Sequence, residues 1–227
     1  MKAPRWIPKR RPAGAEASVE KPKTTREKKA PRTALPGLNE GTGLERVTSW
    51  LATKGWAPHA FQRETWTAYA RGESGVVHVP TGAGKTYAAY LGALADLIDR
   101  NETSADGLKL LYITPLRAVS RDVELALQAP VEALGLPMRI ESRTGDTRET
   151  TKAKQRKALP SVLITTPESL SLLIATSQAP EAFSNVHGVL IDEWHELLGT
   201  KRGTQVELAL ARIRSFSPQV RTWAMTA

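Results

Sequence analysis

The sequence predicts an α/β domain with a mainly parallel sheet and helices on both of its faces. Short apolar runs of strand length occur at residues 76–79, 110–113, 162–165 and 189–191, and two further ones at 139–141 and 222–225. Helical patterns lie between them, at residues 86–98, 118–127, 149–158, 168–175 and 203–214. Strands that alternate with helices form parallel sheets covered on both faces. The 227 residues are enough for one such domain with its own core.

Two helices precede the first strand. Thr42 and Glu45 form a capping-box pattern that opens a helix through Leu51, which ends at Gly55. The second helix starts after Pro58, assigned to the first helical position, and ends at Gly72. The tryptophans of this region, at positions 50, 56 and 66, are assigned to core packing rather than to stacking on a ligand.

The N-terminal segment differs from the rest of the chain in composition. Residues 1–40 are rich in Pro, Lys, Arg and Ala and poor in large apolar residues, which predicts a disordered basic tail before a folded domain at residues 41–227. Residues 1–35 hold 11 Lys/Arg and 3 Asp/Glu, against 21 and 20 in the remainder, so the tail carries +8 of the net charge of +9. A solvated tail is the favoured interpretation, and a phosphate-binding arm is the alternative.

Composition also excludes several classes of protein. The chain has no cysteine, which excludes disulfides and cysteine-based zinc sites. It has no run of 18 apolar residues and no apolar N-terminal signal, so we expect no membrane span and no secretion. These features suit a reducing compartment, and we expect a cytoplasmic protein.

A glycine-rich loop follows the first strand and opens a helix, which is the context of a phosphate-binding loop. Its glycines let backbone N–H groups turn toward phosphate oxygens, and the helix N-terminus favours anions. The lysine is expected to reach the β- and γ-phosphates of ATP, and the last threonine to bind Mg²⁺. Val79 stands where the general pattern has Gly. The loop residues assigned to the nucleotide are Thr81, Gly82, Ala83, Gly84, Lys85 and Thr86.

An acidic box follows the strand at residues 189–191. Asp192 is assigned to Mg²⁺, because a carboxylate at the end of a strand beside the phosphate loop can hold the ion. Glu193 is assigned to orienting or deprotonating the attacking water, and His195 to relaying the ATP state toward bound nucleic acid. The box alone is a weak signal, but its pairing with a phosphate loop 107 residues upstream of Asp192 is a strong one.

Further motifs occur in a fixed order around these two. Phe61-Gln62 lies 23 residues before Lys85, and hydroxyl- or glycine-containing segments follow the strands at residues 114–118, 143–147 and 165–170. Residues 196–203 follow the acidic box. In this order the motifs resemble the first RecA-like domain of superfamily 2 DEXH-box helicases over residues 44–227. The resemblance is greatest to the ligase-associated members of the large-helicase-related (Lhr) class.

The resemblance implies roles for these motifs. Gln62 would recognise adenine, and hydroxyls, bare amides and helix N-termini after the strands would contact a sugar–phosphate backbone without reading its sequence. Singly, each motif is equally compatible with a helix cap or a turn. The residues that the resemblance assigns to nucleic-acid contact are Pro115, Arg117, Thr144, Gly145, Thr166, Pro167 and Arg202.

The resemblance further implies a 3′→5′ DNA helicase acting in DNA repair, with a DNA ligase and a nuclease as partners. An RNA helicase lobe and a nucleotide-dependent binding module without turnover stay open as alternatives. The chain stops within the segment 225–227, where the family has a Ser/Thr-Ala-Thr motif, and before a second RecA-like lobe with its arginine finger. We therefore expect a truncated sequence that hydrolyses ATP weakly and does not unwind by itself.

Overall fold

The computed structural model of the chain describes residue 35, residues 37–116 and residues 120–227. Most of the predicted basic tail and Arg117 lie outside the described residues. Among the described residues no helix is long and apolar enough to cross a membrane.

Six parallel strands form one sheet in the order β1-β6-β5-β2-β4-β3. In β2, Ile113 pairs with Thr165 of β4 on one side and with Ile191 of β5 on the other. These three strands therefore end at the same level, and the loops that follow them share one edge of the sheet. The strands are β1 (Gly75–His78), β2 (Leu110–Ile113), β3 (Ile140–Arg143), β4 (Val162–Thr165), β5 (Gly188–Ile191) and β6 (Arg221–Thr226).

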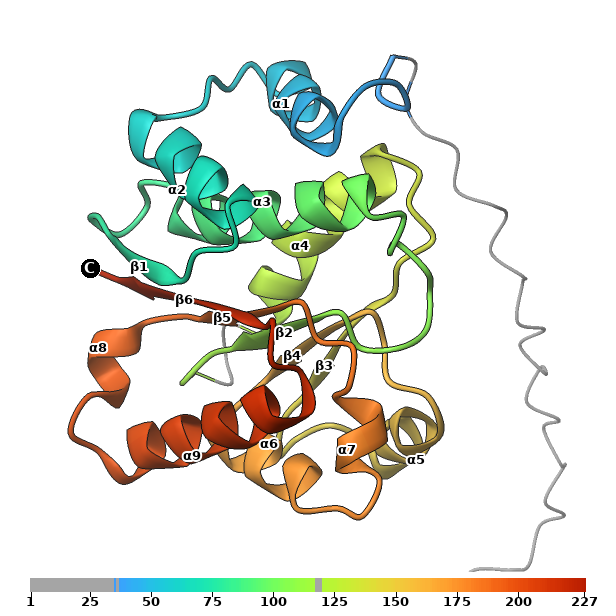
Figure 1. Cartoon of the computed structure of the whole chain (residues 1–227), viewed down its shortest axis with the longest axis vertical. Coiled ribbons are helices and arrows are strands. Elements are labelled where there is room, and N and C mark those ends of the chain that lie inside the picture. Colours follow the sequence, from blue (N-terminus) through green and yellow to red (C-terminus); the bar gives the residue numbers. More distant parts are fainter. Residues whose placement is uncertain (1–34, 36, 117–119) are drawn as a thin grey trace, which may run out of the picture. The chain divides into compact units, whose positions relative to one another are not determined.

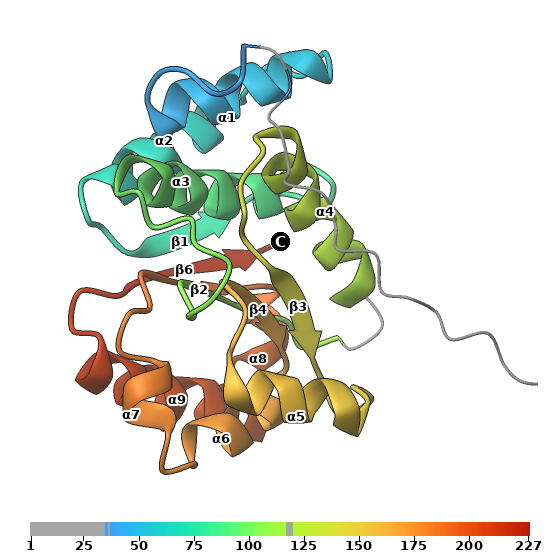
Figure 2. The ribbon, with the colours of Figure 1, turned by 90° about the vertical axis from the view of Figure 1, so that its right-hand side faces the viewer.

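Helices cover both faces of the sheet (Figures 1 and 2). One layer contains α1 (Gly43–Thr53), α2 (Ala60–Ala70), α3 (Lys85–Asp99) and α4 (Ser120–Ala133). The other contains α5 (Glu149–Lys157), α6 (Pro167–Ile174), α7 (Ala179–Ala182), α8 (Trp194–Leu197) and α9 (Lys201–Phe216). Successive residues of a strand pack against opposite layers. Leu190 belongs to the hydrophobic core under the first layer, and its neighbours Val189 and Ile191 belong to the core under the second. The predicted fold class is confirmed.

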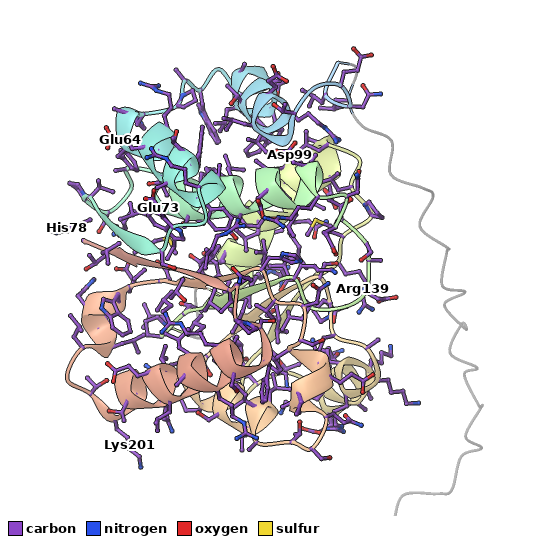
Figure 3. The ribbon with its side chains drawn as sticks, in the orientation of Figure 1. Glu64, Glu73, His78, Asp99, Arg139 and Lys201 are labelled. Carbon is purple, nitrogen blue, oxygen red and sulfur yellow. The ribbon has the colours of Figure 1, made fainter. Side chains whose placement is uncertain are left out.

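The N-terminal helices are fixed by the signals that predicted them, with one correction. Thr42 and Glu45 make both bonds of the capping box, and Gly55, with a φ of 71°, follows the end of α1. Pro58 is not the first residue of α2, because His59 is the N-cap and the helix starts at Ala60. In Figure 3, Asp99 lies at the end of α3 beside α1, where its carboxylate accepts a hydrogen bond of 2.6 Å from the Gly43 amide.

Three further differences from the sequence expectations have tertiary causes. Helix α4 runs to Ala133 and includes Pro130, since Leu127 and Val131 are fully buried and packing outweighs the missing backbone donor. Leu38, which composition placed in the tail, is only 3% exposed and belongs to the core. The four-residue helices α7 and α8 were not predicted, because one helical turn is too short to show a period.

Candidate nucleotide-binding and hydrolysis site

The phosphate loop joins β1 to α3. Gly82 and Gly84 have φ values of 81° and 91°, in the left-handed region that favours glycine, and Gly84 is the N-cap of α3. A Cβ atom at Gly84 would come within 2.8 Å of the Gln62 amide nitrogen, so this position is restricted by space as well as by conformation. Thr81 and Gly82 are exposed and Ala83 is half-buried, which leaves the loop open to a ligand.

The buried amine of Lys85 is the part of the site that most clearly indicates an affinity for anions. Lys85 is 6% exposed, and its Nζ atom has no hydrogen-bond partner among the described residues. The closest counter-charge is Glu193, whose Oε2 atom lies 3.9 Å from Nζ. Burial of an ammonium without hydrogen bonds is costly. An anion that offers oxygen acceptors, such as a phosphate, would remove this cost.

Tyr112 adjoins both residues assigned to Mg²⁺. Its hydroxyl donates a hydrogen bond of 2.9 Å to Oδ2 of Asp192, and the Thr86 side chain is close enough to act on the pKa of that hydroxyl. Burial raises the pKa of the Tyr112 hydroxyl well above its usual range, so it stays protonated. Tyr112 was missed by the sequence analysis. The sequence signal for its role was a hydroxyl-bearing side chain within an otherwise apolar strand, two residues before the segment 114–118.

Asp192 lies at the end of β5 in a largely buried position. Its Oδ1 atom accepts a 3.0 Å hydrogen bond from the Glu193 amide, in addition to the bond from Tyr112. Burial raises the pKa of the carboxyl, and the nearby charge of Glu193 acts in the same direction, while the hydrogen bonds and Lys85 oppose the rise. A bound divalent cation would favour the ionised carboxylate.

Glu193 has a strained backbone, and His195 links it to the end of the sheet. Glu193 is one of two described non-glycine residues with positive φ, at 44°, a conformation that costs on the order of 1–3 kcal/mol and is often found at functional sites. His195 Nδ1 lies 3.1 Å from the Thr226 hydroxyl and 3.5 Å from Glu193 Oε2. The acidic box is thus connected to β6, as a relay through His195 requires.

A cavity of about 320 Å³ adjoins the phosphate loop. Gln62 is 5% exposed at its wall; its side-chain oxygen accepts from the His59 amide at 2.9 Å and its nitrogen donates to the Gly84 carbonyl at 3.1 Å. The amide retains a second lone pair and a second N–H for a ligand. Trp56, assigned above to the core, is 51% exposed and lines this cavity, whereas Trp50 and Trp66 are buried as expected.

The residues assigned to nucleic-acid contact lie in loops at the strand ends, but several are engaged elsewhere. Thr166 is fully buried and caps α6 by accepting a hydrogen bond from the Ser169 amide. Pro167 is the first residue of that helix and is buried, as is Pro115 after β2. Thr144 is buried in a turn after β3, whereas Gly145 is exposed.

Arg202, in the first turn of α9, is paired with an acid. Its Nε and Nη2 atoms bond both carboxylate oxygens of Glu168 at 2.6 and 3.4 Å, and Nη2 also donates to the Pro115 carbonyl at 2.8 Å. Partial burial alone would raise the pKa of the Glu168 carboxyl, but hydrogen bonds, chiefly from Arg202, outweigh it and lower that pKa. No sequence pattern indicates this pair.

The donor set fits a magnesium–nucleotide complex. No group of three or more His, Cys, Asp and Glu side chains is positioned to hold a metal within the described part of the chain. Proteins bind Mg²⁺ through one or two ligands together with substrate phosphates. When bound, Mg²⁺ would neutralise phosphate charge. Thr86 and Asp192 could hold the ion, Lys85 could bind phosphate, and Glu193 could accept a proton from an attacking water.

Known proteins are similar to this chain in sequence. The family model for DEAD/DEAH box helicases matches residues 59–227. A protein of Mycolicibacterium smegmatis named Lhr helicase/probable uracil glycosylase is 39% identical over 178 residues, covering 72% of this chain and 12% of its own length. The Lhr helicase/uracil glycosylase of Escherichia coli is 38% identical over 184 residues, covering 71% of this chain and 12% of its own. The chain thus spans about an eighth of these relatives.

A solved structure adds the fold. The structure of Mycobacterium smegmatis helicase Lhr bound to ssDNA and AMP-PNP aligns with a TM-score of 0.72 and 33% identity, over 82% of this chain and 25% of that one. The fold of this chain is therefore similar to the fold of part of that helicase. On these grounds the chain belongs to the DEAD/DEAH box helicase family, with Lhr helicases among its relatives.

Proposed function

We propose that this chain is the ATP-binding and ATP-hydrolysing lobe of a DNA helicase. The observation that carries the proposal is the shared edge of the sheet. Asp192 follows β5 there, the loops assigned to nucleic acid follow β2 and β4, and these strands end in register. Turnover of ATP at one end of this edge can thus displace loops along the rest of it. A second RecA-like lobe would complete the site and the groove.

DNA is the proposed substrate because the related Lhr structure, 33% identical, was solved with ssDNA and AMP-PNP. ATP with Mg²⁺ is the proposed cofactor, held by Thr86 and Asp192. The loops contain hydroxyl groups and glycines, which suit contacts with the sugar–phosphate backbone of DNA that do not read its base sequence. The 3′→5′ polarity, the role in DNA repair, the DNA ligase and nuclease partners and the cytoplasmic location stay predictions from the resemblance and the composition.

Two substitutions test the nucleotide chemistry. Lys85→Ala is expected to abolish binding of a fluorescent ATP analogue, because Lys85 supplies the buried cation of the phosphate site. Glu193→Gln keeps size and removes the base, so nucleotide binding is retained and phosphate release falls by about 10²–10⁴-fold. Tight binding by Lys85→Ala would contradict the proposal. Equal phosphate release by the wild-type and Glu193→Gln chains would instead support a binding module without turnover.

The nucleic acid is tested separately. Fluorescence anisotropy with single-stranded DNA and RNA of one sequence, with the ATP analogue present, is expected to show tighter binding of DNA. A clear preference for RNA would exclude the DNA assignment and leave the ATPase assignment intact.

A further inference from the structure

We propose that Arg202 is a positioning residue that clamps three strand-end loops into one nucleic-acid-binding edge, rather than a side chain that binds phosphate itself. The proposal rests on the proposed function, and it reverses the direct contact that the resemblance assigned to Arg202. Its basis is a single guanidinium that reaches Glu168 and the Pro115 carbonyl from the start of α9.

The contacts join segments that are distant in sequence. Arg202 follows β5 and α8, Pro115 follows β2 and Glu168 follows β4, at separations of 87 and 34 residues from Arg202. The bond to Glu168 uses two guanidinium nitrogens and both carboxylate oxygens, a fork geometry that fixes orientation. The bond to Pro115 anchors the loop that continues into residues 117–119, which lie outside the described part of the chain.

The local structure aims Arg202 at these partners. Thr200 caps α9 by accepting a 3.1 Å hydrogen bond from the Gly203 amide. A Cβ atom at position 203 would lie 2.1 Å from the Leu197 carbonyl oxygen, so only glycine lets α9 begin this close to α8. On the opposite side, Thr166 caps α6 and thereby sets the direction of Glu168. Both partners of the ion pair thus project from capped helix starts.

The charge balance also argues against a direct phosphate contact. Glu168 cancels the charge of Arg202, and a neutral pair releases no counterions from a nucleic acid. Lys201, the preceding residue, is exposed and projects into solvent from the start of α9 (Figure 3). Lys201 therefore offers a matched control for loss of one positive charge at the same place.

The test compares five variants of the whole chain: Glu168→Ala, Arg202→Lys, Arg202→Ala, the double variant Glu168→Ala with Arg202→Ala, and Lys201→Ala. The affinity for a single-stranded DNA probe is measured by fluorescence anisotropy over a range of salt concentrations. The affinity for the ATP analogue without DNA is the control for folding. The N-terminal tail is the same in every variant, so differences in DNA affinity belong to the substituted residues.

If Arg202 is a clamp, Glu168→Ala and Arg202→Ala weaken DNA binding equally, by about threefold to tenfold, the range for a charge-assisted bond that is partly exposed. The double variant is then no weaker than either single one. Arg202→Lys also loses affinity, because an ammonium cannot form the fork. Nucleotide affinity is unchanged throughout, and Lys201→Ala lowers the salt dependence of DNA binding together with the affinity at low salt.

A direct phosphate contact predicts the opposite sign. Removing Glu168 would then free Arg202 and tighten DNA binding, and Arg202→Lys would bind like the wild type. Either result, or no effect of Glu168→Ala, overturns the clamp. If the wild-type chain itself fails to bind DNA, the proposed function fails, and the clamp with it.

Discussion

Removing one hydroxyl group from Tyr112 tests whether this side chain holds Asp192, one of the residues assigned to Mg²⁺, in place. Tyr112→Phe keeps the ring, which is fully buried, and deletes the donor that bonds Asp192 at 2.9 Å and contacts Thr86. Among the described residues, the Glu193 amide is then the one donor left to Asp192, which stays largely buried. We therefore expect a loss of stability that exceeds the value of an ordinary hydrogen bond.

The magnitude follows from the charge of the acceptor. A hydrogen bond to an ionised group contributes about 1.5–3 kcal/mol. A buried acceptor that loses its donor also keeps the full free-energy cost of its removal from water. For a domain of this size, 1 kcal/mol shifts the unfolding midpoint by about 2–4 °C. Tyr112→Phe should therefore lower the midpoint by roughly 3–12 °C at pH 7.

Tyr90 provides the matched control for this experiment. It is also a fully buried tyrosine, but its hydroxyl has no hydrogen-bond partner among the described residues. Deleting an unsatisfied polar group relieves its desolvation cost, so Tyr90→Phe is expected to raise the free energy of unfolding by about 1 kcal/mol.

Thermal unfolding followed by circular dichroism measures both variants without nucleotide or metal. The two phenylalanine substitutions should change the midpoint in opposite directions. The reasoning is refuted if Tyr112→Phe leaves the midpoint unchanged, or if the two variants are destabilised to the same extent.

Three further predictions concern the phosphate loop, a buried ion pair and the basic tail. Gly84→Ala should weaken binding of the ATP analogue by at least tenfold, because the new Cβ strains a φ of 91° and displaces Gln62; unchanged affinity in a titration would contradict this. The hydrogen bond from Lys109 lowers the pKa of the Glu102 carboxyl. The ionised carboxylate therefore stabilises the folded chain fully above about pH 4.5, and this stabilisation is lost as the pH falls through the pKa of the folded state. Acid unfolding of Glu102→Gln should accordingly show a weaker pH dependence than that of the wild type, and identical curves would exclude the pair as a contributor. Deleting residues 1–34, which hold 11 Lys/Arg and 3 Asp/Glu, should weaken DNA binding and flatten its salt dependence, whereas an unchanged slope would identify a plain solvated tail.

The sequence by itself determined the fold class, the phosphate loop and the acidic box. Each depends on neighbouring residues: apolar runs of strand length, glycines at positive φ before a helix, and carboxylates directly after a strand. The apolar runs at residues 110–113 and 162–165 coincide with β2 and β4, because fully buried parallel strands are apolar on both faces. Capping residues likewise set the start of α1.

Only the tertiary structure decided which distant side chains meet. Tyr112 reaches Asp192 across 80 residues, and Arg202 reaches Glu168 across 34. Both contacts depend on the strand order β5-β2-β4, which brings together strands that are not consecutive in the chain. A local pattern records the preference of a segment for helix or strand, but neither the order of strands nor their register. The family resemblance assigned Arg202 to nucleic-acid contact, and only the folded chain shows that its guanidinium pairs with Glu168.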